Sequence, residues 1–325
     1  MSERHVVMGA GPVGRATAAI LAEQGHEVLL VSRSGTGEEV PGARRVAADA
    51  TDGDRVAQLA EGAAAIYNCI NPPAYDKWAE LWPPVAAALL HAAERSGAVL
   101  VAAGNLYPYG PVDEPMVEGM PDRAQGTKAR IRATMWADML AAHQAGRIRA
   151  AEVRGSDYAG PGVGDGGHLP RLAPRALSGK GVRVFGSPDQ PHSWTDVRDM
   201  GRALVAVAAE ESAWGRIWHA PTNEPRTQRE AVADLCRAVG KEPVPVRAYP
   251  RAILSVGGRV SSLMRELQET VYQFERPYVL DSSAIARELG LEPTPWDEVC
   301  RATATGQPTG QSTGQSTGQP TGTRR

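Results

Sequence analysis

The stretch Gly9-Ala10-Gly11-Pro12-Val13-Gly14 decides the fold. It follows a short apolar run at residues 5–8 and opens a helical pattern that continues to residue 24. Gly9 allows a tight turn, Gly11 lets the backbone approach a pyrophosphate, and Gly14 permits close packing of helix on strand. The helix N-terminus adds oriented N–H groups and the positive end of a dipole. The segment therefore predicts a dinucleotide-binding βαβ unit, with the cofactor contacting Gly9, Gly11, Pro12, Val13 and Gly14.

The N-terminal half alternates short apolar runs with helical patterns, which is typical of an α/β fold with a doubly wound parallel Rossmann sheet. We expect strands at residues 5–8, 27–31, 44–47, 64–68, 98–102 and 149–154. Helices are expected at residues 13–24, 55–60, 84–96 and 128–144, with Pro84 in the first turn of the third. Residues 1–154 are therefore predicted to form an NAD(P)-binding domain.

The composition changes from residue 155 onward: Pro and Gly become frequent, and the expected helices and strands are shorter. Residues 155–304 are expected to form a smaller C-terminal substrate lobe, some of whose elements can return to the main sheet. Helices are expected there at residues 197–210, 227–239 and 282–289. Residues 305–325 repeat Gly-Gln-[Pro/Ser]-Thr without apolar side chains to bury, so we expect a disordered tail.

Composition restricts the class of partner. The net charge of -2 provides no basic field for nucleic acid and no stripe for an anionic membrane. The chain begins without the layout of a signal peptide and carries no run of about 18 apolar residues. Cys69, Cys236 and Cys300 lie far apart and no His spacing resembles a metal motif, so we expect buried thiols and no metal. The expectation is a cytoplasmic protein that binds a small molecule.

The end of the second expected strand distinguishes NADP from NAD. In the NAD version of this fold a carboxylate at that point receives the ribose hydroxyls. Here the segment is Ser32-Arg33-Ser34, and a guanidinium is suited to a 2′-phosphate. Arg33 therefore favours NADP, with NAD as the alternative cofactor; its other interpretation is a solvated surface residue.

Two further loops are placed to contact the cofactor. Asp49, next to Ala50, follows the third strand and either accepts from the adenine amine or caps the next helix, for which Asp52 is the other candidate. Asn71 lies in the loop after the fourth strand, which should line the cofactor ribose or the substrate because ligands bind beyond the carboxyl ends of the strands. The proline pair in that loop is also consistent with a simple rigid turn.

From residue 5 to about residue 300 the chain resembles an extended or atypical short-chain dehydrogenase/reductase of the NAD-dependent epimerase/dehydratase family. Besides the glycine loop, the segments that carry the resemblance are Asp49-Ala50-Thr51-Asp52, Asn105-Leu106-Tyr107-Pro108-Tyr109-Gly110, Arg154-Gly155-Ser156-Asp157-Tyr158-Ala159-Gly160-Pro161-Gly162, Trp194-Thr195-Asp196-Val197-Arg198-Asp199 and Leu289-Gly290-Leu291-Glu292-Pro293. Their order and spacing together are specific. The resemblance also implies a homodimer through the helix that contains Lys128.

The family's catalytic set is a Ser or Thr after the fifth strand and a Tyr-x-x-x-Lys on the next helix. Counting back from Tyr107 places Ala103 at the hydroxyl position, and counting back four from Lys128 places Ala124 at the tyrosine position. No tyrosine lies between Gly110 and Arg154. Only Lys128 matches, and the resemblance implies that it binds the nicotinamide ribose.

Other side chains are candidates for the missing groups. The candidate proton donors are Tyr107, Tyr109, Tyr158 and Asp157, of which Tyr107 is selected beside Lys128. The candidate substrate contacts are Tyr109, Tyr158 and His192, with His168 as a further candidate. Each has packing or a satisfied hydrogen bond as its alternative role. His192 also stands where many family members carry a diphosphate-binding Arg, which argues against a sugar nucleotide.

Two functions follow from this pattern. The first is an NAD(P)-dependent oxidoreductase or epimerase/dehydratase-like enzyme that acts on a small carbonyl, hydroxyl or sugar-like substrate with a non-standard active site. The alternative is a catalytically inactive NADP-binding sensor or regulatory protein. Such a protein would not need the catalytic Ser and Tyr, so this alternative explains why both are missing. The retained substrate lobe favours the enzyme.

Overall fold

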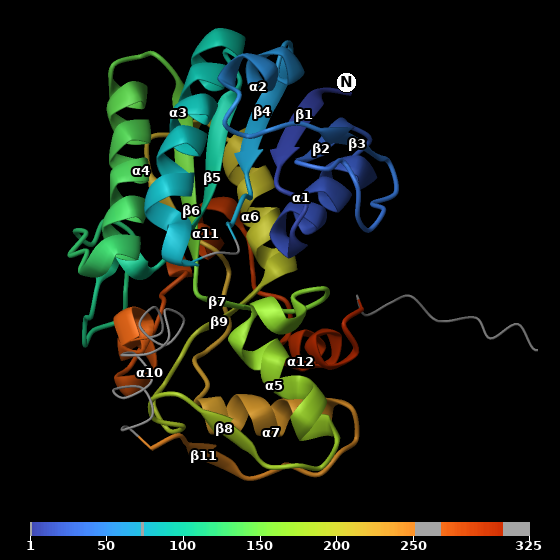
Figure 1. The fold of residues 1–325 in the computed structure, drawn as a ribbon, viewed down its shortest axis with the longest axis vertical. Helices are drawn as coiled ribbons and strands as arrows, with labels where there is room; N and C mark the ends of the chain where they lie inside the picture. Colours follow the sequence, from blue (N-terminus) through green and yellow to red (C-terminus); the bar gives the residue numbers. More distant parts are fainter. Residues whose placement is uncertain (1, 73–74, 251–267, 308–325) are drawn as a thin grey trace, which may run out of the picture.

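The computed structural model describes residues 2–72, 75–250 and 268–307. A central sheet of seven parallel strands has the order β10-β6-β5-β4-β1-β2-β3 (Figure 1). The strands are β1 Arg4–Met8, β2 Glu27–Ser32, β3 Ala43–Ala47, β4 Ala63–Asn68, β5 Val99–Asn105, β6 Arg149–Gly155 and β10 Ile217–His219. The predicted doubly wound parallel sheet is confirmed.

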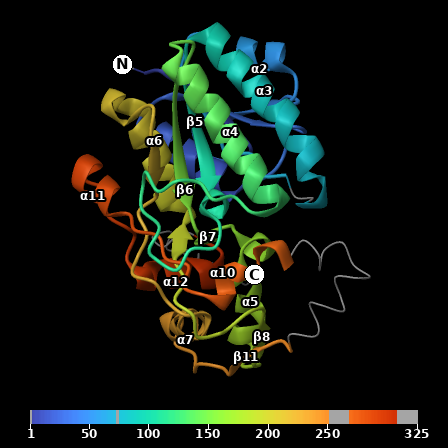
Figure 2. The same cartoon turned by 90° about the vertical axis from the view of Figure 1, so that its left-hand side faces the viewer.

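Helices cover both faces of this sheet (Figure 2). One face carries α2 (Gly53–Leu59), α3 (Trp78–Ser96) and α4 (Gly126–Gln144), and the other carries α1 (Pro12–Glu23), α6 (Val197–Ala209) and α11 (Ser283–Leu289). Side chains of β1 alternate between the two cores: Val6 packs on the α3 side and Val7 on the α1 side. Burial on both faces explains why the strands read as continuous apolar runs.

One helix boundary differs from the sequence prediction. Helix α3 begins at Trp78, so Pro83 and Pro84 lie inside it rather than in its first turn. A proline there removes an N–H donor to the preceding turn, which normally ends a helix. Trp78 and Trp82 are fully buried, and their burial holds the turn in place.

The smaller lobe packs below the carboxyl ends of the strands (Figure 1). Its helices are α5 (His168–Leu177), α7 (Gln228–Ala238), α10 (Tyr272–Glu275) and α12 (Trp296–Thr305). Its short strand pairs are β7 (Asp157–Ala159) with β9 (Trp194–Asp196) and β8 (Val182–Val184) with β11 (Val246–Ala248). As the sequence allowed, α6 and β10 return to the main sheet. Most of the tail expected to be disordered, residues 308–325, lies outside the described residues.

Short 3-10 helices connect several of these elements: η1 Tyr75–Lys77, η2 Tyr107–Tyr109, η3 Gly164–Gly166 and η4 Glu211–Ala213. Within the described ranges, no helix has the length and apolar character needed to cross a membrane. The three cysteines are free and buried, as their wide separation predicted.

Candidate functional site at the carboxyl edge of the sheet

The glycine loop has the geometry its sequence predicts. Gly9 adopts a φ of +104°, and a Cβ atom there would lie 2.7 Å from the Cys69 carbonyl oxygen. A Cβ on Gly14 would lie 1.8 Å from the Gly9 carbonyl oxygen, so helix and turn touch at that point. A Cβ on Gly11 would meet nothing within 4 Å. Gly11 therefore leaves open space in front of the N-terminus of α1, which begins without a side-chain cap.

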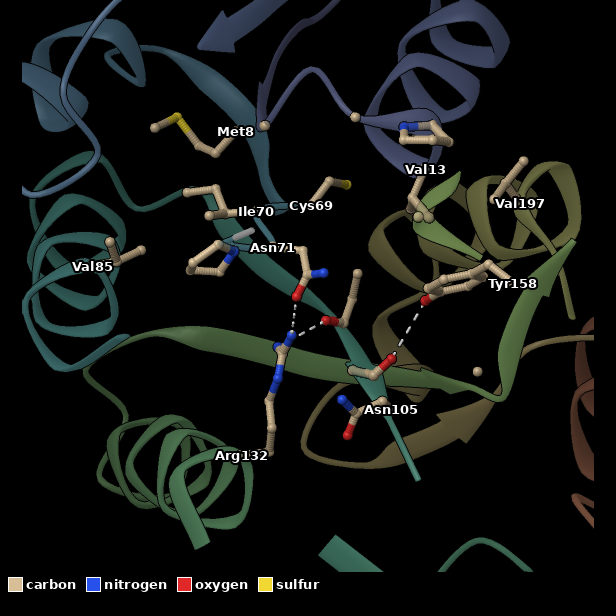
Figure 3. A pocket seen from close by; sticks show the side chains of 18 of the residues that line it. Met8, Val13, Cys69, Ile70, Asn71, Val85, Asn105, Arg132, Tyr158 and Val197 are labelled. Carbon is tan, nitrogen blue, oxygen red and sulfur yellow. Dashed lines mark hydrogen bonds between the residues drawn. The ribbon is translucent and has the colours of Figure 1, made fainter. Parts of the chain in front are cut away.

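The loop borders a cavity of about 600 Å³ that continues to the smaller lobe (Figure 3). One end, which we call the β2 end, lies against the tips of β2 and β3. The other, the lobe end, reaches the entry to the smaller lobe. The β2 end is lined by Ser32, Arg33, Asp49, Ala50 and Thr51, and the polar lining of the lobe end consists of Asn105, Tyr107, Ser156, Asp157, Tyr158, Gln273 and Tyr278.

Arg33 stands at the β2 end with its side chain exposed. A small adjoining hollow is lined by Ala10, Ser32, Arg33, Ser34 and Thr36. The Ser34 and Thr36 hydroxyls are 2.7 Å apart, and the Ser32 hydroxyl accepts from the Gly35 N–H at 3.2 Å. A guanidinium beside three hydroxyls is a donor set suited to a phosphate group.

Asp49 and Asp52 were both candidates for the cap of helix α2, and the structure shows that Asp52 is the cap. Asp52 caps α2 by accepting from the Arg55 N–H at 2.9 Å. Asp49 accepts from both the N–H and the hydroxyl of Thr51 at 2.9 Å, and these bonds lower the pKa of its carboxyl group. Asp49 therefore stays ionised at the cavity edge, as a hydrogen-bond acceptor.

Arg132 is the central charged residue of the cavity, and sequence reasoning missed it. Its guanidinium donates to the Ala103 carbonyl oxygen at 3.3 Å and to Asn71 Oδ1 at 3.4 Å (Figure 3). It also lies over the Trp82 ring, 4.2 Å from the ring centroid. Arg132 follows Lys128 by four residues, one helical turn, and that spacing was the available signal.

Lys128 points elsewhere. It is buried, does not line the cavity, and forms an ion pair of 3.0 Å with Glu269. Glu269 also accepts from the Lys128 backbone N–H at 2.7 Å. Ala124 precedes α4, so it is not the helical position for a tyrosine. Arg132, one helical turn after Lys128, is a basic side chain of α4 that does line the cavity.

Two expected substrate contacts are also placed away from the cavity. The Tyr109 side chain is fully buried, with its hydroxyl 2.8 Å from His219 Nε2 and the Arg154 guanidinium over its ring. His192 is buried behind Asp157, which does line the cavity. Partners far away in the sequence bind both side chains, which a single sequence does not reveal, and their contact with a substrate stays a prediction.

The tyrosines that do line the cavity differ in exposure to it. The Tyr158 hydroxyl donates to the Gly104 carbonyl oxygen at 3.5 Å (Figure 3), and burial raises its pKa. Tyr107 is half-buried in the short helix after β5. Next to Asp157, the buried Ser156 hydroxyl lines the cavity with no hydrogen-bond partner among the described residues. An unpaired buried hydroxyl is costly unless a ligand or water satisfies it.

A separate group of side chains lies at the opposite, amino edge of the sheet. There Glu3, His5 and His26 bring one ligand-type atom each within 4.8 Å of one another. Burial and the neighbouring His26 lower the pKa of His5 to about 4. The group belongs to the start of β1 and β2 and takes no part in the cavity.

Comparisons with known proteins agree with this architecture. The model of the NAD dependent epimerase/dehydratase family matches residues 5–219. The dTDP-glucose 4,6-dehydratases of Shigella flexneri and Escherichia coli are each 26% identical over 125 residues, which is 38% of this chain and 31% of theirs. The match thus spans about a third of the length of these curated relatives.

Solved structures share the whole fold. UDP-glucose 4-epimerase from Brucella ovis in complex with NAD has a TM-score of 0.73 at 20% identity, covering 94% of this chain and 98% of that one. DesIV, a dTDP-glucose 4,6-dehydratase from Streptomyces venezuelae with NAD and TYD bound, has a TM-score of 0.74 at 21% identity, covering 92% and 95%. The likeness to these structures shows the fold, and the family model covers most of the chain. The chain belongs to the NAD dependent epimerase/dehydratase family.

Proposed function

We propose that the chain is an NAD(P)-dependent oxidoreductase or epimerase/dehydratase-like enzyme that acts on a small carbonyl, hydroxyl or sugar-like substrate. One observation carries the proposal: a single cavity joins the glycine loop to the polar lobe end. A nicotinamide cofactor bound along it would supply hydride chemistry. The protein then has to position the substrate and move a proton at its oxygen.

The residues divide this work by position. The glycine loop and the N-terminus of α1 would hold the pyrophosphate. Arg132, fixed by Asn71 and the Ala103 carbonyl, would donate to the nicotinamide ribose in place of Lys128. Tyr107 remains a candidate proton donor because it lines the cavity. The site is non-standard because Ala103 and Ala124, the positions counted from the family pattern, carry neither its hydroxyl nor its phenol.

The β2 end supports NADP as the preferred cofactor. Arg33 and the hydroxyls of Ser32, Ser34 and Thr36 match the three acceptor oxygens of a 2′-phosphate. The Brucella and Streptomyces structures contain NAD, so a preference for NADP would set this chain apart from them.

A second function is favoured by a different observation. Ala103 carries no reactive group, and Lys128 forms an ion pair with Glu269. A protein that binds NADP as a sensor would need neither catalytic position. The smaller lobe, whose residues line the cavity up to Gln273 and Tyr278, favours the enzyme.

Binding and turnover, measured together, separate the two functions. Calorimetric titration with NADPH and NADH should show binding of both, with NADPH tighter. A panel of carbonyl compounds, polyols and nucleotide sugars should then give oxidation, reduction or epimerisation with at least one member. Tight NADPH binding with no turnover across that panel would favour the sensor. Absence of binding would reject both functions.

The dimer through α4 stays a prediction, checked by light scattering of the purified chain.

A further inference from the structure

A carboxylate and an imidazole form a close pair at the lobe end. His192 Nε2 lies 2.8 Å from Asp157 Oδ2, and His192 Nδ1 lies 3.1 Å from the Gln273 carbonyl oxygen. The pairing of β7 with β9 aligns Asp157 with Trp194 and fixes the spacing of the two segments. The imidazole ring is packed against Trp194, Phe274 and Tyr278, with centroids 4.5, 4.6 and 5.3 Å away, so it cannot turn freely.

The partners of His192 define how many protons the pair holds. A backbone carbonyl oxygen only accepts hydrogen bonds, so Nδ1 must carry a proton. An ionised carboxylate also only accepts, so Nε2 must carry one as well. A neutral imidazole has a single N–H and would direct a lone pair at one of these oxygens, whichever tautomer it adopted. The geometry is satisfied by one additional proton, shared between Nε2 and Asp157.

Asp157 is the member of the pair that reaches the cavity. Its side chain is 22% exposed, whereas that of His192 is 1% exposed. Asp157 lines the lobe end beside the Ser156 hydroxyl, which has no hydrogen-bond partner in the described part of the chain. We propose that Asp157 is the acid–base residue of this site, that His192 is the positioning residue that stores its proton, and that Ser156 binds the same substrate oxygen. This rests on the proposed function and names the group that replaces the family's tyrosine.

The proposed step balances as follows. In reduction, the substrate carbonyl carbon receives a hydride, for which the reduced dinucleotide is the co-reactant, and the carbonyl oxygen receives the proton of the pair. The C=O π bond breaks while a C–H and an O–H bond form. The pair is left as neutral His192 beside ionised Asp157, and solvent restores its proton. Oxidation of an alcohol is the reverse.

The tyrosines around the cavity are less suited to this step. The Tyr158 hydroxyl is directed at the Gly104 carbonyl oxygen. Tyr109 does not line the cavity, and its hydroxyl lies 2.8 Å from His219 Nε2. Burial raises the pKa of Tyr278 far above its usual range, which makes it a poor donor of its proton. Tyr107 is the remaining phenol, and it therefore serves as the rival in the experiment below.

Other titratable groups surround the pair and set its pH response. His168 and Arg171 of α5 face Asp157, and Tyr278 borders both Asp157 and the His192 ring. His168 accepts from Arg171 at Nδ1 and lies 2.5 Å from Gln228 Oε1 at Nε2, so one ring proton satisfies it. Because several titratable groups lie close together here, a pH-dependent signal can be ascribed to His192 only when substitution of His192 removes it.

The shared proton can be tested without turnover. In full-length protein with ¹⁵N-labelled histidine, nitrogen shifts of the His192 ring should show both nitrogens protonated at pH 7, and Asp157→Asn should return the ring to one N–H. His192→Asn assigns the signal, and His91→Asn, an exposed histidine of α3, is the matched control. A wild-type His192 with one bare nitrogen at pH 7 would overturn the proposal.

Kinetics on the substrate found by the panel test the catalytic role. Asp157→Asn should lower kcat at least about 100-fold, in the range of lost acid–base catalysis, with an unchanged Kd for NADPH. His192→Asn should lower kcat less and move the limb of the pH profile, while His91→Asn, outside the cavity, should leave both unaltered. Full activity of Asp157→Asn, or loss of activity in Tyr107→Phe alone, would reject Asp157 while leaving the proposed function intact.

Discussion

Gly11 and Gly14 differ in what an added methyl group would meet. For Gly14→Ala the new Cβ collides with the Gly9 carbonyl oxygen, so the helix must shift and stability should fall by about 3 kcal/mol. For Gly11→Ala the space is open, so the melting temperature should be retained. The same methyl group would occupy the approach to the pyrophosphate, and NADPH affinity should drop about 10- to 100-fold. Thermal unfolding and calorimetry on both variants check this contrast; equal NADPH affinity in Gly11→Ala would contradict the assigned phosphate site.

Arg33 is the residue on which the cofactor preference depends. Arg33→Asp replaces a phosphate donor with a repelling charge, so NADPH affinity should fall by about 10- to 100-fold. A carboxylate at that point accepts from ribose hydroxyls, so NADH affinity should stay equal or rise. Arg130→Asp, at an exposed position of α4 outside the cavity, is the charge-matched control and should change neither. An unchanged ratio of the two dissociation constants would remove Arg33 from the cofactor site.

At the scale of elements, the first turn of α4 is held by Glu269. Lys128→Met removes the cation of this ion pair, and Glu269→Gln removes its anion beside the buried Lys128 ammonium. Each should lower the unfolding free energy by about 1–3 kcal/mol, since Glu269 is partly exposed. The double variant should lose less than the sum, and chemical denaturation of the four proteins measures that coupling. If Lys128 bound the ribose instead, Lys128→Met would raise the Kd for NADPH without this coupling.

Elements differ in how far a sequence can predict them. The strands of the sheet are buried on both faces, so their apolar runs mark them to within a few residues. The start of α4 follows a long irregular stretch, and no periodicity there fixes which face of the helix meets the cavity. The sequence therefore assigned the ribose contact to Lys128, whereas Arg132 is the residue of this helix that lines the cavity. The short strands β7 and β9 form only by pairing with each other, and no local pattern in the sequence marks either one. The contact between Asp157 and His192 depends on this pairing, so it was not predicted.

Across the whole molecule, the Rossmann half was predictable and the lobe end was not. The glycine loop acts through residues adjacent in sequence, so a local motif contained its geometry. The lobe end collects Tyr107, Asp157 and Tyr278 from three separate parts of the chain. Their contacts depend on how the smaller lobe docks under the sheet, which no local pattern specifies.

Buried histidines should make the stability of the whole molecule sensitive to mild acid. Burial lowers the pKa of both His168 and His219 to about 4, against about 6.5 in an unfolded chain. Between these values the unfolded state binds protons that the folded state excludes, so their stabilisation is complete above pH 6.5 and is lost as the pH falls toward 4. At pH 5 each should contribute a loss of about 2 kcal/mol. Urea unfolding from pH 7 to pH 4.5 measures this slope, and His219→Gln should reduce it by about one proton. A flat profile in the wild-type chain would mean that these histidines are not held neutral in the fold.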